Sequence, residues 1–167
     1  EAVLGEVAVD KAVRQRLGAH VYGVDMGSPE RHAVQALTRR RLTVSAAESC
    51  TGGLIAKRLT DVPGASAAFL GGVVSYTNDV KHGVLGVPEA LLQQYGAVSE
   101  PVAKAMAEGA RRITGSSLAL SVTGLAGPDG DDRGNPVGTV YIGLAGAGGT
   151  QVTQLFLKGV RKSIRQQ

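Results

Sequence analysis

Residues 43–59, TVSAAESCTGGLIAKRL, carry the pattern that indicates the fold class most clearly. Residues 42–47 form a short apolar run of the kind that makes a buried strand. Apolar side chains follow Gly52-Gly53 at helical spacing, so the chain is expected to turn from a strand into a helix through two glycines. Ser49 lies in this turn. Turns of this kind are typical of α/β proteins, in which ligands bind at the ends of strands.

Further strands and helices are predicted on both sides of this stretch. A helix is expected before it, from Ser28 as N-cap and Pro29 to Arg41. After it we expect a strand at 68–76, a short helix carrying Lys81, helices at 88–95 and 100–113 with Ser99 capping the latter, and strands at 117–123, 137–144 and 151–157. Helices separate some strands and a hairpin-length turn separates the last two. The expected fold is therefore α/β, with a mixed, mostly parallel sheet and helices on both faces.

The composition fits one folded domain. The chain has 167 residues, of which 43% are apolar and 19% charged, unlike the charge-rich and apolar-poor profile of disordered chains. It has 24 glycines, no Trp and 2 Phe, so the core must be built from small aliphatic side chains and the turns must be tight.

Charge and cysteine content exclude several classes of function. The net charge of +4 comes largely from 39–41 and 158–165, and neither run is interleaved with the aromatic residues that stack on bases. Nucleic acid is therefore not an expected partner. A single Cys excludes an internal disulfide, and no Cys/His spacing indicates a metal site. No apolar run approaches the ~20 residues that span a bilayer, and no signal peptide is recognisable. We expect a cytoplasmic protein with no membrane partner.

Two of three polar clusters suggest a nucleophile and its base. Ala47 to Gly53 place Ser49 in a glycine-rich turn whose amides and helix dipole favour an anion, although an N-cap with flexible glycines explains the same pattern equally well. Tyr76, Asn78 and Lys81 follow the next strand. A lysine near a helix start, if also desolvated, loses its proton more easily and could activate a serine, although most lysines simply lie at the surface.

The third cluster runs from Ser121 through Gly124 to Pro128, where another strand ends in a turn rich in backbone donors that could form an oxyanion hole. All three clusters lie at the carboxyl ends of predicted strands, so they should meet at one edge of the sheet. Cys50 is a rival nucleophile, but no histidine supports it, and His20 and His32 lie outside the clusters.

Four motifs together resemble the CinA C-terminal domain family. They are AESCTGG at 47–53, SYTNDVK at 75–81, GAVSEPVA at 96–103, and SVTGLAGPDG at 121–130 with PVGTVYIG at 136–143. The resemblance covers roughly residues 30–165 in the same order. It implies a three-layer α/β/α sandwich and a nicotinamide-nucleotide amidohydrolase, which converts nicotinamide mononucleotide into nicotinate mononucleotide and ammonia in pyridine nucleotide recycling, without a metal or cofactor.

The resemblance also implies roles for individual residues. Ser49 would attack the carboxamide carbon, Lys81 would take its proton and help release ammonia, and Tyr76 would orient the pair by hydrogen bonding. The residues expected to contact substrate or oxyanion are Glu48, Thr51, Gly52, Gly53, Asn78, Thr123, Gly124 and Arg161.

Residues 1–27 resemble the connector that follows an N-terminal domain in longer CinA proteins, so residues 28–167 are expected to form the amidohydrolase domain. One departure stands at Gly159-Val160-Arg161, where the family would have an acidic residue between glycine and arginine. A homodimer is a further expectation, because valine-rich strands would be exposed at a sheet edge.

Two other functions remain open from the sequence. The chain could be a catalytically weak nucleotide-binding or protein-interaction module linked to competence or DNA damage, or it could hydrolyse a different amide with the same pair of residues. The fold alone does not separate them.

Overall fold

The computed structural model describes residues 15–16 and 27–167. The predicted connector at 1–27 therefore lies almost wholly outside the described residues, and so does His20.

A five-stranded sheet organises the molecule, with strands in the order β2-β1-β3-β4-β5. Both neighbours of β1 run parallel to it, whereas β4 runs antiparallel to both of its neighbours, β3 and β5. The mixed sheet is confirmed, but the prediction that it is mostly parallel is wrong. The reason is that β3 also pairs antiparallel with β4, in addition to the expected hairpin of β4 and β5 at the two-residue turn 147–148, so two of the four strand pairs are antiparallel. The strands are β1 Val44–Glu48, β2 Phe69–Val74, β3 Leu118–Gly124, β4 Thr139–Gly146 and β5 Gly149–Phe156.

The helices between residues 29 and 114 form where apolar periodicity and capping residues predict them, and the structure adds a 3-10 turn and a helix after the last strand. They are α2 Pro29–Arg39, α3 Leu54–Thr60, a 3-10 turn at Ala65–Ala67, α4 Asn78–Gly83, α5 Glu89–Tyr95, α6 Glu100–Thr114 and α7 Arg161–Gln166. Ser28 caps α2 as expected, since its hydroxyl accepts the amide of Arg31 at 3.4 Å. Ser99 stands at the N-cap of α6 but does not cap it, because its hydroxyl donates to the Gly96 carbonyl at 2.9 Å.

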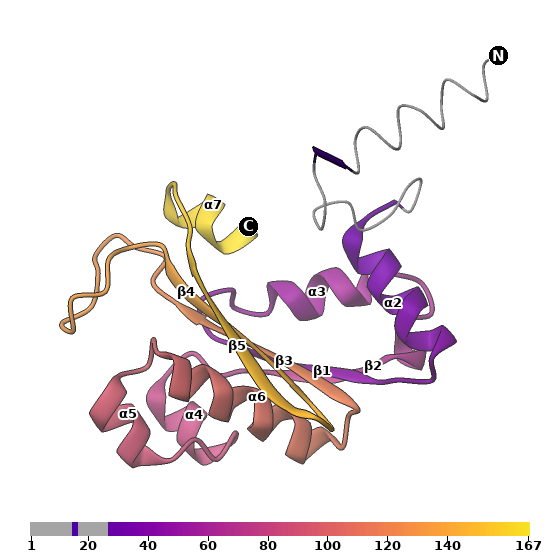
Figure 1. The fold of residues 1–167 in the computed structure, drawn as a ribbon, viewed down its shortest axis with the longest axis horizontal. Helices are drawn as coiled ribbons and strands as arrows, with labels where there is room; N and C mark the ends of the chain where they lie inside the picture. Colours follow the sequence, from indigo (N-terminus) through magenta and orange to yellow (C-terminus); the bar gives the residue numbers. More distant parts are fainter. Residues whose placement is uncertain (1–14, 17–26) are drawn as a thin grey trace.

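Helices lie against both faces of the sheet, with α4, α5 and α6 on one face and α2 and α3 on the other (Figure 1). On the first face, Val102 and Met106 of α6 are fully buried in a cluster with Ala47 of β1. On the second face, Val44 of β1 packs with Val34 and Leu59 of the two helices. Both sides of β1 are therefore covered, which explains why all five of its residues are buried.

Glycines allow the closest approaches between elements. A Cβ at Gly109 of α6 would overlap the Leu85 carbonyl oxygen, and one at Gly143 of β4 would lie 2.5 Å from Ser121 Oγ. α6 can approach the segment at Leu85, and β4 can approach Ser121 of β3, only because glycine has no side chain at these points. The high glycine content thus serves packing within the sheet layers as well as turns.

Three parallel strands, β2, β1 and β3, end at the same edge of the sheet. The segments that follow them therefore come together there, as the positions of the polar clusters predict. No helix among residues 15–16 and 27–167 is long and apolar enough to cross a membrane.

Candidate active site

The three polar clusters of the sequence meet in one cavity of about 200 Å³ at the carboxyl ends of β1, β2 and β3. Its lining combines groups that follow all three strands with two residues of the segment before α6 and one residue of α7. The lining residues are Ser49, Cys50, Tyr76, Asn78, Lys81, Ala97, Val98, Thr123, Gly124, Ala126 and Arg161. Seven of the eleven predicted site residues are thus brought together, and four, namely Glu48, Thr51, Gly52 and Gly53, do not line the cavity.

Ser49 and Lys81 form a direct pair in this cavity. The Lys81 Nζ atom lies 3.1 Å from Ser49 Oγ and donates a second hydrogen bond of 2.8 Å to the Ser75 carbonyl oxygen. Lys81 is only 1% exposed and Ser49 9%. The backbone of Ser49 is fixed in turn, because its amide donates to the Val122 carbonyl of β3 at 3.0 Å.

The surroundings of Lys81 favour its neutral form. Burial lowers the pKa of Lys81 below its usual range, and only the neighbouring Cys50 acts in the opposite direction. Within the described part of the chain, no carboxylate forms an ion pair with Lys81. The sequence predicted that the start of a helix lowers this pKa, but Lys81 lies in the last turn of α4, so desolvation is the cause. A neutral amine held by the Ser75 carbonyl can turn its lone pair to the Ser49 hydroxyl.

Glu48 lies outside the cavity and has a different set of partners. Its carboxylate accepts the Thr51 hydroxyl at 2.6 Å and three amides at the start of α3, those of Gly53, Ile55 and Ala56, at 2.8–3.0 Å. The sequence predicted that the start of this helix attracts an anion, and the anion that the structure places there is Glu48 itself. Glu48 and Thr51 thus hold the turn that carries Ser49.

Gly52 and Gly53 also shape this turn rather than the cavity wall. Both have a left-handed backbone conformation, with φ of 63° and 96°, which residues other than glycine rarely adopt. Their conformation lets the chain leave β1 and enter α3 within a few residues.

Tyr76 contacts Arg161 rather than the Ser49–Lys81 pair. Its ring is 56% exposed, and its hydroxyl accepts a hydrogen bond of 2.7 Å from the Arg161 guanidinium. Arg161 also donates to the Gly127 carbonyl oxygen at 2.7 Å. The predicted hydrogen bond from Tyr76 to the pair is absent among the described residues, because the side chain extends along the rim toward α7. The direction of Arg161 is set by these two partners, while the unusual neighbour Val160 is 74% exposed.

The β3 side of the cavity is built by Thr123 and Gly124. Thr123 is fully buried and donates to the Ala97 carbonyl at 2.7 Å, which ties the 96–98 segment to the cavity wall. A Cβ at Gly124 would lie 2.8 Å from the Thr139 carbonyl oxygen of β4. The carbonyls of Ser75 and Ala97 were missed by sequence analysis, because a backbone group gives no signal in residue identity.

Cys50 is the other nucleophilic side chain at the cavity. Burial raises the pKa of its thiol, against smaller opposing contributions from nearby amides and from Arg165 and Lys81. A buried thiol with a raised pKa forms little of the reactive thiolate. The environment therefore favours Ser49 over Cys50 as the nucleophile.

No group of three or more His, Cys, Asp or Glu side chains within 15–16 and 27–167 could hold a metal ion. His82 directly follows the cavity residue Lys81 in the sequence. Its Nδ1 atom forms a hydrogen bond of 2.9 Å with the Val87 carbonyl oxygen.

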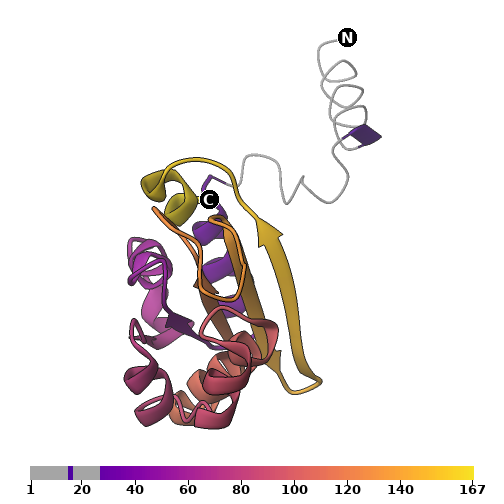
Figure 2. The same cartoon turned by 90° about the vertical axis from the view of Figure 1, so that its left-hand side faces the viewer.

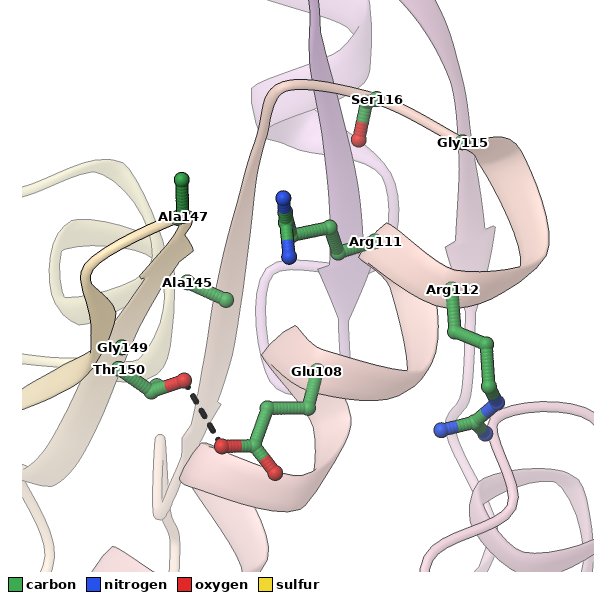
Figure 3. Close-up of a pocket in the computed structure, with 10 residues that line it drawn as sticks. Glu108, Arg111, Arg112, Gly115, Ser116, Ala145, Ala147, Gly149 and Thr150 are labelled. Carbon is green, nitrogen blue, oxygen red and sulfur yellow. Dashed lines mark hydrogen bonds between the residues drawn. The ribbon is translucent and has the colours of Figure 1, made fainter.

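A larger cavity of about 580 Å³ lies between the end of α6 and the β4–β5 hairpin (Figure 3). Its polar groups bond within the protein: Glu108 accepts from Thr150 at 2.8 Å, and Arg111 donates to the Ser117 carbonyl at 3.2 Å. It contains no pair of nucleophile and base, so its size does not make it the better candidate.

The chain is similar to CinA proteins over most of its length. A model of the CinA C-terminal domain matches residues 27–167. A CinA-like protein of Geotalea uraniireducens is 50% identical over 168 residues, covering 99% of this chain and 40% of the relative. A CinA-like protein of Geobacter sulfurreducens is 50% identical over 153 residues, covering 92% of this chain and 37% of the relative. The chain thus spans about two fifths of the length of these curated relatives.

Solved structures give the same result for the fold. The competence/damage inducible protein CihA of Agrobacterium tumefaciens has a TM-score of 0.79 at 39% identity, covering 87% of this chain and 89% of that one. The competence damage-inducible protein A of Klebsiella pneumoniae has a TM-score of 0.80 at 32% identity, covering 81% and 84%. The chain belongs to the CinA C-terminal domain family.

Proposed function

We propose that this chain hydrolyses the carboxamide of nicotinamide mononucleotide to nicotinate mononucleotide and ammonia, with Ser49 as nucleophile and Lys81 as general base. The observation that carries the proposal is the buried 3.1 Å contact between Lys81 Nζ and Ser49 Oγ, in which burial lowers the pKa of the lysine. The family to which the chain belongs supports the choice of substrate.

In the first half of the reaction, neutral Lys81 accepts the proton of the Ser49 hydroxyl as Oγ forms a bond to the carboxamide carbon. The tetrahedral intermediate collapses when the C–N bond breaks, and the leaving nitrogen takes a proton from Lys81 and departs as ammonia. In the second half, water attacks the acyl ester. Lys81 accepts a proton from that water and returns it to Ser49 Oγ, which releases the carboxylate product and restores both groups.

The size of the cavity indicates how the substrate is oriented in it. A volume of about 200 Å³ is small for a whole nucleotide, since pockets for drug-sized ligands hold ~300–1,000 Å³. We place the carboxamide ring inside, beside Ser49, and the ribose phosphate over the rim. There Arg161 keeps further N–H donors beyond the two that bind Tyr76 and Gly127, and a guanidinium suits a phosphate.

The main test measures release of ammonia and nicotinate mononucleotide from nicotinamide mononucleotide. Ser49→Ala and Lys81→Met should each lower kcat by about 10³-fold or more, as expected when one member of a nucleophile–base pair is removed. Lys57→Met is the matched control, because Lys57 is a surface lysine of α3 paired with Asp61. Circular dichroism of all four proteins shows whether each is folded.

The outcomes separate the functions that the sequence leaves open. A folded parent that binds the nucleotide without turnover would instead be a binding module. A parent that hydrolyses other primary carboxamides, but not this one, would keep the Ser49–Lys81 chemistry and change the substrate. Activity that survives Ser49→Ala would overturn the mechanism.

Two further expectations belong to the same proposal. Helices on both faces of the sheet support the three-layer α/β/α sandwich that the resemblance implies (Figure 1). β5 is an edge strand of the sheet (Figure 2), and its Phe156 is 65% exposed, which supports association of two copies. Light scattering should then give a mass that rises with concentration, and Phe156→Glu should lower it to that of one chain.

A further inference from the structure

Helix α7 contributes two arginines, one turn apart, to the carboxyl edge of the sheet. Arg161 reaches Tyr76 and the Gly127 carbonyl at the cavity rim. Arg165 reaches the turn that carries Ser49. Between them in sequence, Ile164 is 4% exposed and packs with Cys50 and Val122, so the helix is fixed against the strand ends.

Arg165 binds two consecutive backbone carbonyls directly after Ser49. Its Nε atom donates to the Cys50 carbonyl oxygen and one terminal nitrogen donates to the Thr51 carbonyl oxygen, both at 2.9 Å. Gly52 leaves room for this contact, because a Cβ at that position would lie 2.9 Å from the same terminal nitrogen, which would then have to shift. A planar guanidinium can make two such bonds in fixed directions, whereas an ammonium cannot.

The turn is held from its other side by Glu48, whose carboxylate accepts the Thr51 hydroxyl and the Gly53 amide. Arg165 therefore fixes carbonyl groups while Glu48 fixes a hydroxyl and amides of one short turn. Since a trans peptide places its C=O and N–H on opposite sides, holding the Cys50 carbonyl also orients the Thr51 amide. Together these contacts set where Ser49 stands relative to Lys81.

We propose that Arg165 is a positioning residue for the amidase reaction, which holds the Ser49 turn in the geometry that Lys81 needs. This inference rests on the proposed function. The guanidinium does not line the cavity of Ser49 and Lys81, so it acts through the turn and not on the substrate.

The test compares Arg165→Met with Lys162→Met, which removes the same charge from an exposed position on the same helix. Because a misplacement of about 1 Å can cost about 10²-fold in rate, we expect kcat of Arg165→Met to fall by about 10–100-fold with KM within about 2-fold. Arg165→Lys should recover part of the rate, since an ammonium can bind one of the two carbonyls. Lys162→Met should match the parent.

A second readout does not depend on turnover. Hydrogen exchange followed by mass spectrometry should be faster for the peptide spanning residues 49–53 in Arg165→Met, and unchanged there in Lys162→Met, at equal melting temperatures. If the parent turns over and Arg165→Met keeps its kcat, the positioning role is wrong while the proposed function stands. If the parent does not turn over, the proposed function fails. Unchanged hydrogen exchange at 49–53 in Arg165→Met would also overturn the positioning role of Arg165.

Discussion

At the scale of single residues, burial decides the chemistry of the site. Lys81 and Ser49 are both shielded from water, and the amine is held by the Ser75 carbonyl without a neighbouring carboxylate to stabilise its charge. An ordinary surface lysine would be protonated at neutral pH and could not accept a proton. Burial thus favours the neutral form of Lys81, which the proposed role as a base requires.

The pH dependence of the reaction should report this amine. Since the pKa of Lys81 is lowered by burial, kcat/KM should rise with pH through a midpoint below the ordinary lysine value of 10.5. The measurement is kcat/KM for nicotinamide mononucleotide between pH 6 and 10. A rate that stays flat over this range down to pH 6, or that falls as the pH rises, would contradict a lysine base.

The same shift affects stability. Below the folded-state pKa both states are protonated, and the folded protein carries the cost of a buried charge. Between that pKa and the unfolded value of about 10.4, the unfolded chain binds more protons, so the free energy of unfolding should rise with pH. Urea titrations at several pH values should show this slope, and Lys81→Met should remove it.

Thr139 provides a residue-scale test outside the site. Its side chain is fully buried at the start of β4, and its hydroxyl has no hydrogen-bond partner in the described part of the chain. An unsatisfied buried polar group costs about 1–3 kcal/mol. Thr139→Val should therefore raise the free energy of unfolding by about 1 kcal/mol, measured by urea denaturation. Thr123→Val is the contrasting variant and should destabilise, because it removes the bond to the Ala97 carbonyl.

At the scale of elements, the start of α3 depends on one carboxylate. Four donors converge on Glu48, which is 1% exposed. Glu48→Gln places an amide NH₂ against some of these donors and removes the charge that strengthens the bonds, so it should lower the free energy of unfolding by about 2–3 kcal/mol. Glu30→Gln is the matched control. It weakens the partly exposed pair with Arg58 and should change the free energy of unfolding much less than Glu48→Gln does.

Most elements were predictable because their signals are local. Ser28-Pro29 marks the start of α2, and the glycine pair at 52–53 marks the passage from β1 to α3. The mistakes concern the choice between possible partners, which the identity of a residue does not fix. Ser99 donates to a nearby carbonyl instead of capping α6, and β3 pairs in opposite directions with β1 and β4. Strand direction depends on how the chain crosses the sheet, which residue spacing does not record.

The candidate site was likewise predictable only in part. The convergence of Ser49, Lys81 and Thr123 could be predicted, because side chains after parallel strands share one edge. The partner of Tyr76 and the role of Arg165 could not, because each depends on where the last helix docks. In the sequence, Arg165 belongs to a basic run that resembles any solvated helix end.

At the scale of the whole molecule, the structure describes all of residues 27–167, which is the range that the family model matches. Among the described residues, the three apolar clusters are built from residues 34–164. A chain of residues 27–167 should therefore keep the melting temperature of the full 167 residues within about 2 °C, and its kcat and KM as well. Differential scanning calorimetry and the amidase assay check this. A loss of several degrees would show that residues before 27 stabilise the domain.

The one thiol of the chain gives this molecule a built-in reporter of its own motions. Cys50 is 8% exposed, stands next to Ser49, and has a thiol whose pKa is raised by burial. A disulfide reagent should react slowly with this thiol in the closed state and faster when the surrounding segment opens, so the labelling rate reports on that opening. Substrate bound in the cavity should slow the labelling in proportion to its occupancy. Affinity and local opening could then be followed at natural sequence, without an attached dye and without any turnover.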